Sequence, residues 1–149
     1  MSTQAKEIQK PNTFFETYAD AMENFDTKLM AMHYALPCSF ISDEATQVFT
    51  EASKLEGLFN QGMSFYKQFG IAHIRPDIWS KRAWTGRIVK VKLNWQYFDT
   101  KNQPAYNCDY NYILKLDKHD KWKIEVAVAI NEKQRMEEWL ASRNGSMAK

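Results

Sequence analysis

The sequence predicts a single α+β domain in which three or four helices cover one face of a curved antiparallel sheet. Apolar residues recur at helical spacing over residues 14–33 and 55–69, whereas they alternate with polar residues over most of residues 71–130. Helices followed by a long meander are typical of the α+β class. The chain has 149 residues, which suits one domain with its own core. We expect that domain at residues 13–143, between a flexible leader (1–12) and a flexible tail (144–149).

Two short helices are expected first. Asn12 or Thr13 can cap the first helix, and Asp26 is a typical N-cap for the second. The second helix should close near Ala35, because Pro37 disfavours helical backbone in the residue before it.

A short hairpin and a long helix are expected next, with strand candidates at residues 38–42 and 46–49. Thr50 or Ser53 can cap the long helix, and Gly70 provides a C-terminal stop.

Four strands with a period of two follow, at residues 71–80, 87–98, 105–116 and 122–130. The second of them carries Val89, Val91, Leu93, Trp95 and Tyr97 on one face, and the third carries Tyr106, Cys108, Tyr110, Tyr112, Leu114 and Leu116. A last helix is expected to begin at Asn131, as its cap, and to end near Ser142.

Composition argues against several classes of protein. The formal net charge is only +2, which gives no support for nucleic-acid binding. No apolar run approaches the ~18 residues of a membrane span, and the polar start MSTQAKEIQKPN does not resemble a secretory signal. Two cysteines do not make a disulfide framework, and the three histidines show no metal-ligand spacing. We therefore expect a cytoplasmic protein without a metal or an organic cofactor.

Three segments resemble the nuclear transport factor 2-like superfamily, which includes the SnoaL-like and ketosteroid-isomerase-like families. They are YADAMENFDTKLMAMHY (Tyr18 to Tyr34), LNWQYFD (Leu93 to Asp99) and KWKIEVAVAI (Lys121 to Ile130). The resemblance covers about residues 12–131. It implies a cone-shaped barrel with a pocket at its open end, and a homodimer.

Strand alternation, placed on that fold, predicts the lining of the pocket. The meander would contribute Trp95, Tyr97, Tyr106, Cys108, Tyr110 and Tyr112, and the helices would contribute Tyr18, Met22, His33 and Tyr34. Such a lining suits a flat hydrophobic or aromatic molecule that carries one or two polar atoms.

The resemblance also implies catalytic candidates. Tyr18 matches the position of the family's oxyanion tyrosine, and Tyr112 the position of a second hydrogen-bond donor. The family's base position falls on Ser42, so the proton would be moved by His33, or by Asp43, which lies one residue away.

Three functions remain open on the sequence. One is a small-molecule-binding protein, with cofactor-independent isomerase, cyclase or dehydratase chemistry as its catalytic form. Another is a non-catalytic dimeric binding or assembly domain whose tyrosines belong to the core. The third, a partner-binding module like nuclear transport factor itself, rests only on the resemblance in fold. A cavity that survives among the packed aromatic side chains favours the first.

Overall fold

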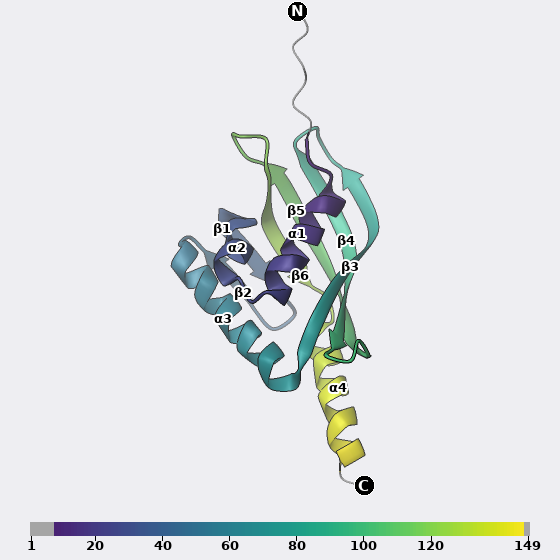
Figure 1. Cartoon of the computed structure of the whole chain (residues 1–149). Helices are drawn as coiled ribbons and strands as arrows, with labels where there is room; N and C mark the ends of the chain where they lie inside the picture. The colour runs from purple at the N-terminus through teal and green to yellow at the C-terminus, as the bar shows by residue number, and fades with distance from the viewer. Residues whose placement is uncertain (1–7, 148–149) are drawn as a thin grey trace, which may run out of the picture.

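The computed structural model describes residues 8–147, which form four helices and one six-stranded sheet (Figure 1). In chain order the elements are α1 (Pro11–Glu23), α2 (Thr27–Met32), β1 (Tyr34–Ile41), β2 (Thr46–Phe49), α3 (Ala52–Phe69), β3 (Ile71–Ala83), β4 (Ile88–Asp99), β5 (Pro104–Leu116), β6 (Trp122–Ala129) and α4 (Glu132–Met147). This is the predicted α+β class and the predicted order of elements.

The sheet has the strand order β2-β1-β6-β5-β4-β3 and remains open, because β2 and β3 are its two edges. Every neighbouring pair is antiparallel except β1 and β6, which are parallel. The expected sheet was antiparallel throughout. The difference arises because α3 carries the chain to the far edge, and the meander returns β6 to the side of β1.

Helix ends agree with the sequence where a side chain or a glycine defines them. Asp26 caps α2, since its Oδ1 accepts a hydrogen bond from Leu29 N at 3.1 Å. Gly70 ends α3 at a φ of 72°, in the left-handed region that glycine adopts readily.

The predicted caps of α1 and α3 are wrong. Helix α1 follows Lys10 and has Pro11 in its first turn, where a missing N–H costs no helical hydrogen bond. Helix α3 follows Glu51, and neither cap residue makes a capping hydrogen bond through its side chain. The sequence offered several polar cap candidates at each start, and the helices begin at other positions.

Helix α2 is shorter, and β1 longer, than expected. The helix ends at Met32, His33 is its C-cap, and β1 begins at Tyr34 instead of Cys38. The proline fits within β1 because residues 35–37 have no partner in either neighbouring strand. A missing N–H therefore costs no ladder hydrogen bond there.

The chain ends also differ from the expectation. Helix α1 begins inside the predicted leader, whose residues 1–7 lie outside the described residues. Helix α4 continues past Ser142 to Met147, inside the predicted tail, of which residues 148–149 are not described. Figure 1 shows α4 extending away from the body of the fold.

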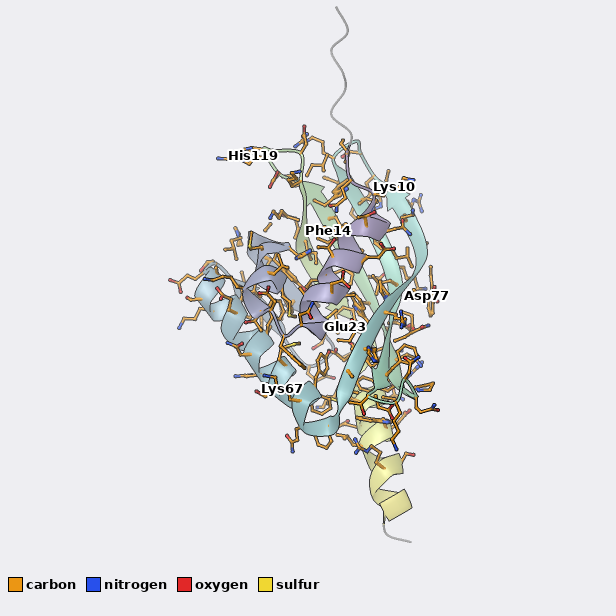
Figure 2. The ribbon with its side chains drawn as sticks, in the orientation of Figure 1. Lys10, Phe14, Glu23, Lys67, Asp77 and His119 are labelled. Carbon is orange, nitrogen blue, oxygen red and sulfur yellow. The ribbon has the colours of Figure 1, made fainter. Side chains whose placement is uncertain are left out.

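The core lies on the concave side of the sheet, beneath α1, α2 and α3. The face of β4 assigned from alternation is confirmed, because Val89, Val91, Leu93, Trp95 and Tyr97 are all buried. Helix α1 is fixed to β3 by Glu23, whose Oε1 accepts the Ile74 N–H at 2.6 Å. Figure 2 shows Glu23 at the end of α1 that lies beside β3.

Among residues 8–147, no helix combines the length and the apolar character that crossing a membrane requires.

Candidate functional site

A cavity of about 530 Å³ remains between the concave face of the sheet and the helices. All seven tyrosines of the chain contribute to its lining. They are Tyr18, Tyr34, Tyr66, Tyr97, Tyr106, Tyr110 and Tyr112, and they come from α1, β1, α3, β4 and β5. The aromatic side chains therefore do not fill the cone, and the lining is rich in hydroxyl groups.

The cavity reaches the surface between the β1–β2 hairpin and α3. Ala45 and Gln47 from the hairpin and Gln61 from α3 belong to the lining, and all three are exposed. Helix α4 contributes Glu132 and Met136, both partly exposed. A molecule could therefore enter between these elements without unfolding the sheet.

Two pairs of buried polar groups stand at the inner wall. The hydroxyls of Tyr18 and Tyr34 are 2.6 Å apart, and Trp95 Nε1 donates to the Tyr112 hydroxyl at 2.8 Å. Burial raises the pKa of Tyr18, Tyr34 and Tyr112, so these phenols keep their protons at neutral pH. The Tyr112 proton is free to be donated, because its oxygen is the acceptor from Trp95.

Glu132 is the one charged side chain in the lining among the described residues. The Tyr110 hydroxyl donates to its Oε1 at 2.6 Å. Burial raises the pKa of the Glu132 carboxyl, and the hydrogen bond from Tyr110 partly offsets that rise. The carboxyl group is thus held at the edge of an apolar space.

Asp109 of β5 fixes the start of α4 and so places Glu132. Its backbone N–H donates to Asn131 Oδ1 at 2.8 Å, and Asn131 Nδ2 donates back to Asp109 Oδ2 at 3.0 Å. Asn94 Nδ2 donates to Asp109 Oδ1 at 2.9 Å. Asn131 directly precedes α4, as expected of its cap, and its carbonyl oxygen accepts from Arg135 N, while its side chain binds the neighbouring strand.

Most of the predicted pocket residues do line this cavity. They are Tyr18, Met22, Tyr34, Trp95, Tyr97, Tyr106, Tyr110 and Tyr112. Cys108 is fully buried and does not reach the lining, and its sulfur lies 3.8 Å from the Tyr97 hydroxyl.

The two residues suggested for proton transfer lie elsewhere. Asp43 is exposed in the turn between β1 and β2 and does not line the cavity. His33 is buried outside the lining, where its ring packs against Phe14 and Tyr18 and its Nδ1 lies 2.8 Å from the Leu29 carbonyl oxygen. Burial lowers the pKa of His33, which favours the neutral ring of a core histidine.

Tyr66 and Glu132 are among the lining residues that the sequence did not indicate as site residues. Tyr66 belongs to the apolar stripe of α3, and that position gave no sign that it would face a cavity. Glu132 stands in the first turn of α4, where an acidic residue is ordinary because it favours the helix dipole. Glu132 reaches the lining of the cavity because α4 begins at the end of the sheet.

A metal site finds no support in the described residues. Among residues 8–147, no three acidic, histidine or cysteine side chains are grouped closely enough to hold an ion.

Solved structures of the same fold come from several bacteria. An NTF-2 like protein of unknown function from Shewanella oneidensis MR-1 has a TM-score of 0.64 at 12% identity, over 79% of this chain and 93% of that one. A ketosteroid isomerase-like protein from Erwinia carotovora atroseptica SCRI1043 has a TM-score of 0.62 at 10% identity, over 85% and 97%. A putative calcium/calmodulin dependent protein kinase II association domain from Xanthomonas campestris has a TM-score of 0.58 at 13% identity, over 79% and 82%. Identities this low show a shared fold and leave the activity open.

No curated protein matches the sequence. A family model does match, over residues 7–132, and its description is "NTF2-like protein (DUF6841)". This match takes in α1, α2, α3, the whole sheet and the first residue of α4, and it agrees with the resemblance drawn from the sequence. The chain therefore belongs to this family of NTF2-like proteins.

Proposed function

We propose that this protein binds a small, flat, largely apolar molecule in the tyrosine-lined cavity. The observation that carries the proposal is the convergence of all seven tyrosines on one cavity of about 530 Å³. A volume of this order is typical of ligand sites, and aromatic walls with a few placed polar groups are their usual lining. Tyrosines distributed only for stability would have no reason to meet around a space that remains open.

The catalytic form of the proposal is cofactor-independent isomerase, cyclase or dehydratase chemistry. Tyr18 and Tyr112 would donate hydrogen bonds to an oxygen of the ligand on which negative charge develops. The placement of His33 and Asp43 outside the lining gives no support to proton transfer by either. Glu132 carries the one carboxyl of the lining among the described residues, and it is the remaining candidate for the proton-transfer step.

Two glycines of α3 allow a matched test of binding. Gly62 lines the cavity and Gly57 does not, and a Cβ added at either position meets no atom within 4 Å. Both lie inside the same helix, so Gly62→Phe and Gly57→Phe make the same change of helix propensity. Only the first introduces bulk at the cavity.

The experiment is a fluorescence titration with N-phenyl-1-naphthylamine, an uncharged aromatic probe that brightens in apolar surroundings. We expect saturable one-to-one binding to the unchanged protein and to Gly57→Phe, with at least about tenfold weaker binding to Gly62→Phe. Absence of saturable binding to the unchanged protein, or equal affinity for all three, would contradict the proposal.

The second candidate is a non-catalytic dimeric assembly domain. Ile88, Phe98 and Ile113 lie on the sheet face away from the cavity, and they are only partly buried in the single chain. Sedimentation equilibrium of the unchanged protein and of Ile113→Lys tests this homodimer. A dimer weakened by the lysine is the expected result, and a monomer at all concentrations would remove the candidate.

A further inference from the structure

The charged groups of the lining limit the chemistry of the ligand more than the shape of the cavity does. No lysine, arginine or histidine belongs to the lining among the described residues, and Glu132 is its one ionisable carboxyl. Seven tyrosines, Phe40, Phe59 and Trp95 surround the space, and their ring faces carry partial negative charge. Glu132 is therefore the one acidic group of the wall among the described residues, and no lining cation compensates it.

The side chain of Glu132 has one oxygen available. Tyr110 occupies Oε1, and no other hydrogen bond or salt bridge of Glu132 occurs in the described part of the chain. Arg135, one helical turn further on, donates to Asn107 Oδ1 at 2.9 Å instead of turning to this carboxylate. Oε2 is therefore left for a group that enters the cavity.

Keeping a carboxylate beside apolar groups costs free energy unless it is paired with an opposite charge. The fold nevertheless secures Glu132 there through the hydrogen bonds between Asp109 and Asn131. A ligand that brings a positive charge would offset the cost and would also be attracted by the aromatic faces. A ligand carboxylate or phosphate would meet repulsion from Glu132 and no counter-ion.

We infer that the ligand of this cavity is a small aromatic or alicyclic molecule with one basic nitrogen, whose ammonium group pairs with Glu132 Oε2 while its apolar body lies among the tyrosines. The inference rests on the proposed binding function and names its ligand class.

Three naphthalene probes of nearly equal shape test the charge preference. They are 1-naphthylmethylamine, 1-naphthalenemethanol and 1-naphthoate, which are cationic, neutral and anionic at neutral pH. Calorimetric titration of each into the unchanged protein should give an affinity for the amine about tenfold or more above that for the alcohol, because a hydrogen-bonded ion pair adds to the same apolar contacts. The carboxylate should bind most weakly.

Glu132→Gln keeps the shape of the side chain and removes its charge. In that variant the amine should lose its advantage, while the alcohol should bind as before. Glu137→Gln makes the same change of net charge on an exposed part of α4 outside the lining, and it should leave all three affinities unchanged.

The outcomes separate the two proposals. If none of the probes, nor N-phenyl-1-naphthylamine, binds the unchanged protein, the binding function itself fails. If the alcohol binds as tightly as the amine, or if Glu132→Gln leaves the preference intact, the binding function stands and the inference about the basic nitrogen is refuted.

Discussion

The pair of phenols formed by Tyr18 and Tyr34 gives a quantitative test of the inner wall of the cavity. Both side chains are buried, at 4% and 5% exposure, and their oxygens are 2.6 Å apart. Tyr18→Phe removes one hydroxyl and leaves the other without its partner. A buried polar group left unpaired costs about 1–3 kcal/mol, so we expect the free energy of unfolding to fall by that amount. Tyr34→Phe should give a similar loss.

The double variant Tyr18→Phe/Tyr34→Phe should be less damaging than the sum of the two. Replacing both partners by apolar groups of the same shape leaves no unpaired hydroxyl, so its loss should stay below about 1 kcal/mol. The double-mutant cycle should then show an interaction of at least about 1 kcal/mol between the hydroxyls, because the two single losses together exceed the loss of the double variant by that amount or more. Urea unfolding followed by tryptophan fluorescence and by circular dichroism measures all four proteins.

A different result would refute this reasoning. Single variants within about 0.5 kcal/mol of the unchanged protein, with additive effects, would mean that water in the cavity satisfies either hydroxyl once its partner is gone. The inner wall would then be hydrated, and the pair would contribute little to stability.

Three further predictions concern the parts of the fold around the cavity. Burial lowers the pKa of His33 below its ordinary 6.5, so its stabilising contribution is present above that pH and is lost as the pH falls through the lowered pKa. The stability of His33→Gln should therefore fall less than that of the unchanged protein between about pH 7 and about pH 5 in urea titrations, and equal slopes would contradict a buried neutral ring. Burial raises the pKa of Cys38 to about 11 and that of Cys108 higher still, so neither thiol should react with a disulfide reagent at about pH 8 until urea unfolds the chain. Gly70→Ala should lower the free energy of unfolding by about 1–2 kcal/mol, because the left-handed backbone is unfavourable for alanine even though its Cβ meets no neighbour. An unchanged thermal unfolding temperature would show that α3 can end in another conformation.

Periodicity predicted this fold well because its main elements, such as α1, α3, β4 and β5, each bury one apolar face. Alternation alone located Trp95 and Tyr112 on the inner face, and the spacing of apolar residues located α1 and α3. The parallel pairing of β1 with β6 could not be predicted in this way. Alternation tells which face of a strand is buried, and it carries no information on which strand lies beside it.

The sequence predicted the aromatic walls of the candidate site, but it did not predict that Glu132 would belong to the lining. Tyrosines on the inner face of a strand point into whatever the sheet encloses, so alternation was sufficient for them. Glu132 lies just after the last strand, and its placement depends on the contact between Asp109 and Asn131, which are far apart in the sequence. The family's base position lies beside Asp43, so the resemblance gave no indication of a carboxylate at Glu132.

The parallel pairing also sets the order in which the chain can reach its final structure. Tyr34, the first residue of β1, pairs with Ile124 of β6, so this part of the sheet cannot close until nearly the whole chain has left the ribosome. Until then Tyr34 and Phe40, whose ring centroids are 5.1 Å apart in the finished fold, lack the neighbouring strand β6. Contacts this distant in sequence slow folding and lengthen the exposure of apolar surface. A chain truncated before Trp122 lacks β6, so its aromatic residues would remain exposed, and we expect it to aggregate.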